Sequence, residues 1–205
     1  MKILLTGYEP FGGEKINPSW EAVKQLDGKV INGVEVVAEE MPVVWNDIDS
    51  EFESAMEKHK PDAVICVGQA GGRTAISLER VAINKTKGKD NVGVTRDEEL
   101  IREDGESAYF STLPIQEMET SIRELKVPVH ISNTAGLYLC NYIFYAARYF
   151  AEKNSLAVPA GFVHIPFIPE QVAVKDQPAK YASMDLSLVV KSLEEMVKVL
   201  ARNQV

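Results

Sequence analysis

Short apolar runs alternate with amphipathic stretches along most of the chain. The apolar runs have the length typical of β-strands, whereas the amphipathic stretches repeat their apolar residues at helical spacing. The pattern predicts strands over residues 2–6, 34–41, 63–67, 78–83, 127–131 and 161–165. It predicts helices over residues 19–26, 47–59, 115–125, 137–150 and 185–201.

Residues 47–59 show the helical pattern clearly. Apolar residues recur at one-turn spacing, and the stretch ends in a Lys-His-Lys-Pro sequence, which places cations at the negative end of the helix before a proline stops it.

Strands separated by such helices indicate βαβ crossovers. The sequence therefore predicts an α/β fold with a mixed, mainly parallel central sheet and helices on both sides. We expect a single domain over residues 1–205, in which the charged residues 85–106 form a flexible loop or a solvated edge hairpin.

Composition narrows the class of protein. The chain has 205 residues, of which 45% are hydrophobic and 25% charged, with a formal net charge of -8. That charge argues against nucleic acid or an anionic membrane as partner, because both need clustered Lys and Arg. Two cysteines in different contexts give no sign of a disulfide framework, and no signal peptide or membrane span is evident. We expect a cytoplasmic protein.

Cys140 is the candidate nucleophile. It follows the predicted strand 127–131 and an Asn-Thr-Ala-Gly turn, and it falls in the first turn of the predicted helix 137–150. Unpaired N–H groups and the helix dipole favour a thiolate there, and the thiolate is the reactive species. The alternative is a buried cysteine that acts as a small hydrophobe. Cys66 lies inside an apolar strand, so we expect its thiol to be inert.

Two glycine-containing loops follow predicted strands, where α/β proteins place ligand sites. Residues 6–13 (TGYEPFGG) match neither a phosphate loop nor a dinucleotide fingerprint; Tyr8 and Phe11 either form an aromatic slot or pack on the core. Residues 68–73 (GQAGGR) form either an anion-binding nest or a tight connection. Neither loop by itself identifies a ligand.

Three histidines are candidates for the base that would activate Cys140. We expect His59 to lie in solvent at a charged helix end and His130 to pack within its strand. His164 is the best of the three, because it ends a strand that runs into a proline-containing loop. Glu79 stands alone among apolar neighbours, and its default interpretation is a surface carboxylate paired with Arg80. No metal-ligand spacing is present in the sequence.

Four blocks, taken in this order, resemble the pyroglutamyl peptidase type I family, also called pyrrolidone carboxyl peptidase. They are residues 6–13 with Asn-Pro at 17–18, residues 67–73 with 79–84, residues 132–141, and residues 164–171. Together they span nearly the whole chain. The resemblance implies a three-layer α/β/α sandwich of the phosphorylase/hydrolase kind, and an intracellular cysteine peptidase that removes an N-terminal pyroglutamyl residue from peptides.

The resemblance also implies which residues act. Its catalytic triad falls on Cys140, His164 and Glu79, and the acyl-enzyme is a thioester. The implied substrate-binding residues are Tyr8, Phe11, Asn17, Gln69, Tyr138 and Leu139. The family implies no cofactor and no metal, a peptide substrate with N-terminal pyroglutamate, and assembly into homodimers or homotetramers.

The chain departs from the family pattern after residue 84. Residues 85–93 read KTKGKDNVG, where the family usually carries Ala-Arg-Ile-Pro-Asp-Asn-x-Gly. An arginine that normally lies near the site in the family is therefore absent, or replaced by Lys87 or Lys89. This departure bears on the expected rate of catalysis and on how the pocket closes, more than on the triad. Tyr8 stands in place of the usual phenylalanine and adds a hydroxyl at the pocket edge.

Two other functions remain open from the sequence. The first is a phosphate-using, nucleoside phosphorylase-like transferase that binds phosphate with Gly71, Gly72 and Arg73 and leaves Cys140 structural. The second is a non-catalytic binder of pyroglutamyl groups or related lactams, in which the altered residues 85–93 mark lost activity.

Overall fold

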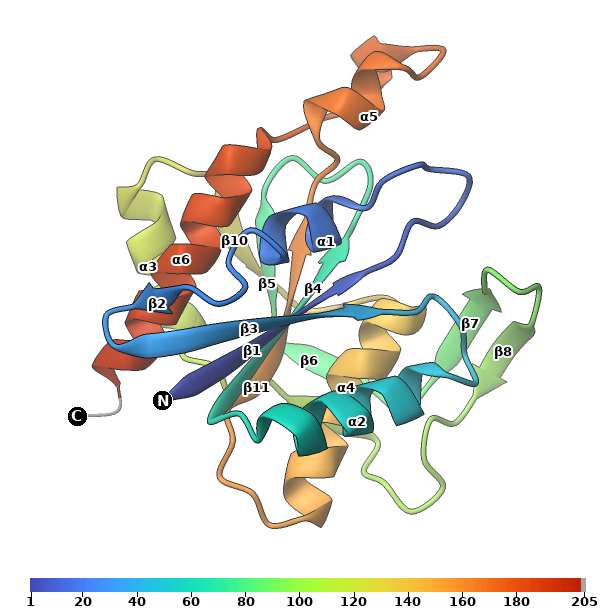
Figure 1. The fold of residues 1–205 in the computed structure, drawn as a ribbon. Coiled ribbons are helices and arrows are strands. Elements are labelled where there is room, and N and C mark those ends of the chain that lie inside the picture. The colour runs from blue at the N-terminus through green and yellow to red at the C-terminus, as the bar shows by residue number, and fades with distance from the viewer. Residues whose placement is uncertain (204–205) are drawn as a thin grey trace.

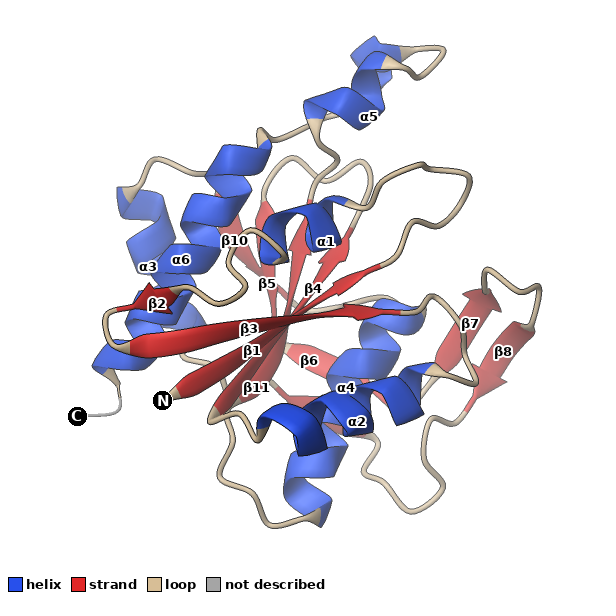
Figure 2. Cartoon of the chain, viewed as in Figure 1, coloured by secondary structure: helices blue, strands red, loops and turns tan. Residues whose placement is uncertain are grey.

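A seven-stranded sheet forms the centre of the computed structural model, which describes residues 1–203 (Figures 1 and 2). In spatial order its strands are β10 (Val129–Ser132), β5 (Ile76–Glu79), β11 (Ala160–Ile165), β4 (Ala63–Gln69), β1 (Lys2–Tyr8), β3 (Val34–Met41) and β2 (Val30–Ile31). Strands β3, β1, β4 and β11 are parallel, whereas β5 and β10 run opposite to β11 and β2 runs opposite to β3. The predicted mixed, mainly parallel sheet is confirmed.

Helices cover both faces of this sheet (Figure 2). One face carries α1 (Pro18–Val23), α3 (Ile115–Glu124) and α6 (Leu186–Arg202), and the other carries α2 (Ile48–His59) and α4 (Leu139–Lys153). A short helix α5 (Pro169–Ala173) and a 3-10 turn (Pro178–Lys180) form an arm that extends beyond the sheet (Figure 1). The three-layer arrangement follows from these two helical layers.

The alternation of side chains along each strand builds two separate hydrophobic cores. In β1, Ile3 and Leu5 belong to the core under α1, α3 and α6, whereas Leu4 belongs to the core under α2 and α4. Strand β11 follows the same rule, so that Phe162 packs on the α4 side. A strand buried on both faces reads as a continuous apolar run, as β4 does.

The predicted strand 78–83 is divided in the structure. Strand β5 ends at Glu79, and the chain continues as β6 (Val81–Ile83), which pairs with β9 (Ala108–Phe110) in a separate two-stranded sheet. At Arg80 the backbone N–H donates to the Ser132 carbonyl, and the Arg80 carbonyl accepts the N–H of Ser111. The chain therefore changes sheets at this residue, immediately after Glu79.

Residues 85–106 contain a hairpin rather than a flexible loop. Strands β7 (Thr86–Lys89) and β8 (Thr95–Glu99) pair with each other and form a sheet of their own, away from the edge of the central sheet.

The helix expected from residue 137 begins at Leu139. Within residues 1–203, no helix combines the length and apolar character that crossing a membrane requires.

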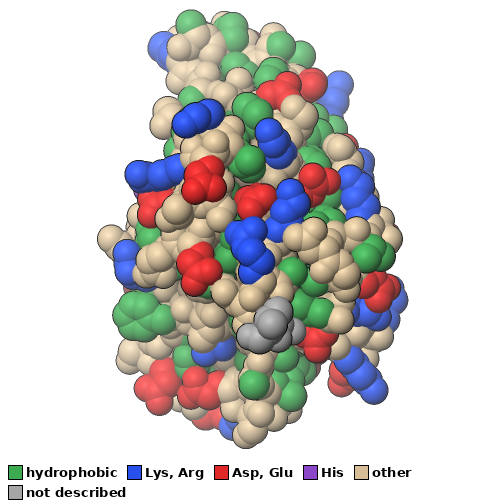
Figure 3. All heavy atoms as spheres, turned by 90° about the vertical axis from the view of Figure 1, so that its left-hand side faces the viewer, with side chains coloured by type: hydrophobic (Ala, Val, Ile, Leu, Met, Phe, Trp, Pro, Cys, Tyr) green, Lys and Arg blue, Asp and Glu red, His purple; other side chains and the backbone are tan. Residues whose placement is uncertain are grey.

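The surface on the α3–α6 side carries charges of both signs. In Figure 3, basic and acidic side chains are interspersed on this face rather than gathered by sign. Ion pairs such as Lys29 with Glu194 and Arg123 with Glu119 account for part of this mixture. The face therefore offers no continuous basic stripe of the kind that binds nucleic acid.

Asn141 joins α4 to β6 through its side-chain amide. Its Nδ2 donates to the carbonyls of Ile83 (2.8 Å) and Lys85 (3.0 Å), and its Oδ1 accepts the N–H of Ile83 (2.9 Å). Asn141 is 1% exposed. The amide thus pairs the Ile83 N–H and the Lys85 carbonyl, and it fixes β6 beside the first turn of α4.

Replacing Asn141 by alanine tests this contact between α4 and β6. Asn141→Ala removes these hydrogen bonds and leaves the Ile83 N–H and the Lys85 carbonyl without partners, each costing about 1–3 kcal/mol, whereas the Ile83 carbonyl still accepts the Lys85 N–H. We expect the free energy of unfolding, measured by urea titration, to fall by about 3 kcal/mol. The exposed Asn46→Ala is the control and should change it by less than about 0.5 kcal/mol. A fall below about 1 kcal/mol for Asn141→Ala would contradict the assigned role.

Candidate active site

A cavity of about 250 Å³ lies where the carboxyl ends of β1, β4 and β11 meet the start of α4. Ligand sites in open α/β sheets occupy this position. The lining residues are Tyr8, Phe11, Val43, Gln69, Gly71, Ala135, Tyr138, Leu139, Cys140 and His164. The cavity thus brings together Cys140, His164 and most of the residues that the sequence indicated for substrate binding.

Cys140 is the second residue of α4, and its side chain enters the cavity from the helix start. The space that its sulfur occupies depends on Gly68 at the end of β4. A Cβ at position 68 would lie 2.9 Å from the Cys140 Sγ and 2.6 Å from the Phe162 ring. The first N–H groups of α4 have no acceptor within the helix, so they are free to bind a developing oxyanion near the sulfur.

The prediction that the helix start lowers the pKa of Cys140 is wrong. Burial raises the pKa of the Cys140 thiol to about 12, the charge of Glu79 raises it further, and Arg73 opposes the shift. Cys66 lies on β4 under the α2–α4 core, where burial also raises its pKa to about 12. Both cysteines are therefore thiols at neutral pH, and Cys140 needs a base to become a nucleophile.

His164 and Glu79 form a buried pair beside the cavity. The distance between His164 Nδ1 and Glu79 Oε1 is 2.8 Å, and the two residues are 4% and 0% exposed. Burial lowers the pKa of His164 below its ordinary value, against the opposing effect of Glu79. Burial alone would raise the pKa of Glu79, but the contacts with His164 and Arg73 and the nearby Ser132 hydroxyl lower it. The resting pair is a neutral imidazole beside a carboxylate.

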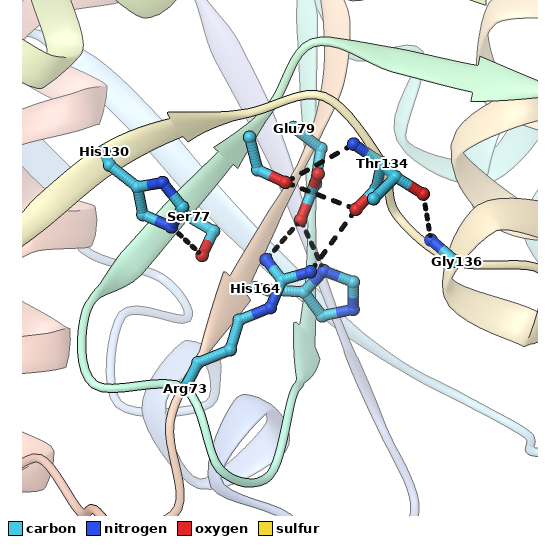
Figure 4. A network of polar contacts seen from close by, with 8 residues as sticks. Arg73, Ser77, Glu79, His130, Thr134, Gly136 and His164 are labelled. Atoms are coloured by element: carbon cyan, nitrogen blue, oxygen red, sulfur yellow. Dashed lines mark hydrogen bonds and ion pairs between the residues drawn. The ribbon is translucent and has the colours of Figure 1, made fainter.

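The default interpretation of Glu79 as a surface residue paired with Arg80 is wrong. Glu79 is fully buried, and its cationic partner is Arg73, whose Nη1 lies 2.6 Å from Glu79 Oε1 (Figure 4). Arg80 instead donates to the side chain of Asn133. Arg73 also donates through Nη2 to the Thr134 carbonyl at 3.3 Å. Because the Arg73 guanidinium is directed at Glu79, the loop of residues 68–73 is a connection that supports the pair of Glu79 and His164. The structure does not favour an anion-binding nest in this loop.

The other two histidines lie away from the cavity. His130 was expected to pack within its strand, but it is exposed, and its Nε2 lies 2.8 Å from the Ser77 hydroxyl (Figure 4). His59 is half-buried rather than solvated, because its Nε2 lies 2.6 Å from a Glu39 oxygen. Neither lines the cavity, which leaves His164 as the histidine of the site.

Aromatic rings form one wall of the cavity. The rings of Phe11 and Tyr138 lie 6.3 Å apart, and Tyr138 packs edge-on against Trp45 at 5.3 Å. Tyr8 lines the same cavity and is almost fully buried. Its hydroxyl donates to the Leu139 carbonyl at 2.7 Å, so the tyrosine ties the end of β1 to the first turn of α4.

Two predicted binding residues differ in their placement. Gln69 lines the cavity, and its Oε1 accepts a hydrogen bond from Gln171 Nε2 at 2.8 Å. Asn17 is the N-cap of α1: its Oδ1 accepts from the N–H and hydroxyl of Ser19, and its Nδ2 donates to the Glu9 carbonyl. Asn17 is not among the residues that line the cavity, so the geometry favours support of the 6–13 loop over direct contact.

Residues 85–93, which lack the family's Arg-Ile-Pro, are anchored at the cavity edge. The Tyr138 hydroxyl donates to the Lys89 carbonyl, and the Asn91 side chain donates to the Glu9 carboxylate and the Pro10 carbonyl. Gly88 has φ of +130°, and a Cβ there would lie 2.7 Å from the Tyr138 ring. The Lys87 ammonium pairs with Asp97 instead. Neither Lys87 nor Lys89 lines the cavity, so the idea that one of them replaces the missing arginine finds no support.

Val43 was not indicated by the sequence patterns, and three further residues lie in the loop and blocks described above without having been assigned to substrate binding. Val43, Gly71 and Ala135 line the cavity, and Gln171 contacts Gln69 from α5. Val43 could have been found, because it follows β3, whose carboxyl end lies beside that of β1. Ala135 is a small residue in a turn and carries no distinguishing signal. Among the described residues 1–203, no cluster of three or more His, Cys, Asp or Glu side chains is arranged to hold a metal ion.

Known proteins resemble this chain over nearly its whole length. The family model for pyroglutamyl peptidase matches residues 1–203. The pyrrolidone-carboxylate peptidase of Streptococcus suis is 47% identical over 196 residues, which cover 95% of this chain and 89% of that protein. The enzyme of the same name from Thermosipho africanus is 45% identical and covers 98% of both chains.

Solved structures share the fold of the chain. Pyroglutamyl peptidase I of Bacillus amyloliquefaciens superposes with a TM-score of 0.93 at 40% identity, covering 98% of this chain and 97% of that one. A mutant pyrrolidone carboxyl peptidase of the hyperthermophile Pyrococcus furiosus superposes with a TM-score of 0.97 at 38% identity, covering 100% of both chains. The chain therefore belongs to the pyroglutamyl peptidase family and is a hydrolase of the cysteine-peptidase type.

Proposed function

We propose that this chain removes an N-terminal pyroglutamyl residue from peptides, with Cys140 as nucleophile, His164 as general base and acid, and Glu79 as the group that orients the imidazole. One observation carries the proposal: Cys140 and His164 line the same cavity, and the Nδ1 of His164 lies against the fully buried carboxylate of Glu79. A nucleophile, a base and an orienting acid are the parts that covalent acyl transfer needs.

The reaction begins from a neutral thiol and a neutral imidazole. His164 Nε2 takes the Cys140 proton as the sulfur attacks the carbonyl carbon that joins pyroglutamate to the next residue. The carbonyl oxygen becomes an oxyanion, which the N–H groups at the start of α4 stabilise. His164 then returns the proton to the departing amine, which leaves as the C–N bond breaks. Water, deprotonated by His164, hydrolyses the thioester and frees pyroglutamate and the thiol.

The chemistry of the cavity fits a pyroglutamyl ring. Pyroglutamate is a neutral lactam without an α-ammonium group. Among the described residues that line the cavity, none is Asp, Glu, Lys or Arg, and most are apolar or aromatic. A peptide with a free N-terminal ammonium would lose its hydration there without gaining a carboxylate partner, which costs several kcal/mol. The cavity therefore favours the closed lactam over an open glutamyl or glutaminyl terminus.

We assign the ring contacts to the cavity wall. Tyr8, Phe11, Tyr138 and Leu139 offer apolar surface to the two faces of the lactam. Polar partners for its N–H and carbonyl come from Gln69 and the backbone beside it. Asn17 acts indirectly, because its capping of α1 and its bond to the Glu9 carbonyl hold the loop that carries Phe11.

The alternatives are less well supported. A phosphorylase-like reaction would need Arg73 to bind phosphate, but its guanidinium is committed to Glu79 and Thr134. A binder without activity would not need a buried carboxylate–imidazole pair beside a thiol. A single domain over residues 1–205, a cytoplasmic location and assembly into homodimers or homotetramers remain predictions.

The first prediction concerns the nucleophile. Cys140→Ser should lower kcat/KM for release of the fluorophore from a pyroglutamyl-aminocoumarin substrate by roughly 10⁴-fold or more, because the serine hydroxyl is a far weaker nucleophile in the same position. Cys66→Ala is the matched control, since Cys66 is buried outside the cavity. It should keep kcat/KM within about threefold of wild type. Equal activity of wild type and Cys140→Ser would contradict the assignment, as would an inactive, folded wild type.

The second prediction concerns pH. The base must be neutral, and burial lowers the pKa of His164 below its ordinary value of 6.5. As pH falls, kcat/KM should therefore remain high through 6.5 and decline only below it. On the alkaline side the thiol pKa of about 12 predicts no decline from Cys140 through about pH 9. An acid limb above 6.5 together with an alkaline limb near about 8.5 would instead indicate a different resting charge state.

A further inference from the structure

Arg73 contacts the acid of the proposed triad, although it lies outside the cavity lining. Glu79 Oε1 is within hydrogen-bonding distance of both His164 Nδ1 (2.8 Å) and Arg73 Nη1 (2.6 Å), as Figure 4 shows. Glu79 Oε2 has no hydrogen-bond partner within residues 1–203. Over the same residues, Arg73 provides the one permanent positive charge in contact with this completely buried carboxylate.

The same guanidinium joins three segments of the site. It starts from the loop that follows β4, reaches the last residue of β5, and donates through Nη2 to the Thr134 carbonyl in the turn before α4. Its side chain is 28% exposed, so solvent reaches Arg73 but not Glu79. Loss of this contact would leave a buried negative charge with the imidazole alone to balance it.

We propose that Arg73 is a positioning residue for the reaction: its guanidinium keeps the Glu79 carboxylate ionised and directed at His164, and its positive charge offsets that of the carboxylate, so that the imidazole stays neutral and able to act as a base. The inference rests on the proposed roles of Glu79 and His164.

The charges around the pair explain why a fixed cation is needed. With Arg73 present, a carboxylate beside a neutral imidazole gives no net charge in the buried group. Without it, the pair would hold an unbalanced negative charge and would take up a proton from solvent at a higher pH. Consistent with this, the charge of Arg73 lowers the pKa of both His164 and Cys140.

The other titratable groups near His164 do not replace Arg73. Cys140 on α4 and Tyr8 on β1 face the cavity side of the imidazole, and Cys66 lies on the adjacent β4. On the other side Ser77 of β5 is the register partner of His164, and its hydroxyl lies against the exposed His130 of β10. The one histidine among these groups, His130, contacts Ser77 rather than Glu79.

The experiment compares wild type, Arg73→Gln, Arg73→Lys and the neighbouring Arg80→Gln, which loses a guanidinium bonded to Asn133 and not to Glu79. Each protein is labelled with ¹⁵N-histidine, and the ring nitrogens are followed by NMR against pH, with His164→Gln used for assignment. This readout reports the charge of the pair whether or not the protein turns over substrate. Circular dichroism establishes that each variant is folded.

We expect the pair in Arg73→Gln to take up its proton about one pH unit higher than in wild type, with Arg80→Gln unchanged and Arg73→Lys close to wild type. The acid limb of kcat/KM should move by the same amount, so that activity on the acid side falls about tenfold more than on the plateau. If the titration and the acid limb of Arg73→Gln stay at their wild-type positions while only rate or stability falls, Arg73 is merely structural and the proposal is wrong.

Failure of the proposed function would look different. In that case wild type would release no fluorophore, or Cys140→Ser would keep its activity, while the titration of His164 would still report on Arg73. A folded Arg73→Lys keeps the test decisive should Arg73→Gln fail to fold: a titration shift of about one unit in the lysine variant, which keeps the charge, would overturn the proposal.

Discussion

A fully buried carboxylate sets the requirements for the whole site. Glu79 is 0% exposed, and a charge in such a position is stable only when it is paired and hydrogen-bonded. Its two partners come from different parts of the chain, Arg73 from the loop after β4 and His164 from β11. Arg73 also donates to the Thr134 carbonyl in the turn before α4. The pairing of one side chain therefore holds together the segments that carry His164 and Cys140.

The sheet topology makes that pairing possible. Strand β5 runs antiparallel to β11, with Glu79 in register with Phe162, and parallel to β10, with Glu79 in register with Ser132. The last residue of β5 is thus enclosed between two strands of the central sheet. The chain leaves the central sheet at Arg80 and continues as β6. Glu79 therefore stays buried in the sheet, whereas β6 lies beside α4, where Asn141 bonds to Ile83.

Local sequence patterns predicted the parts of the molecule that depend on local rules. The alternation of apolar runs and amphipathic helices was sufficient for the mixed sheet and its two helical layers, which the solved relatives share. The position of Cys140 at a helix start and of His164 near a strand end also followed from the chain itself. The hairpin of β7 and β8 was left open, because charged strands with glycine carry little β signal.

Properties that depend on tertiary contacts could not be obtained in this way. Glu79 and His164 are separated by 85 residues, so only the resemblance to the family indicated their pairing. The helix-start rule predicted a lowered pKa for Cys140, but burial, which the local sequence does not encode, dominates and raises it. The resemblance to the family indicated Asn17 as a substrate-binding residue, yet its side chain forms hydrogen bonds with the neighbouring Ser19 and Glu9.

We propose that Cys140 acts as a nucleophile in a pocket shaped for a neutral lactam. Intact mass spectrometry and peptide mapping after reaction with pyroglutamyl chloromethyl ketone test it most directly, with the prolyl reagent, which carries a ring ammonium, as a matched comparison. We predict a single adduct on Cys140, slowed by added pyroglutamate, no adduct on Cys66, and much slower labelling by the prolyl reagent. Labelling at another residue, or equal labelling by both reagents, would contradict the account.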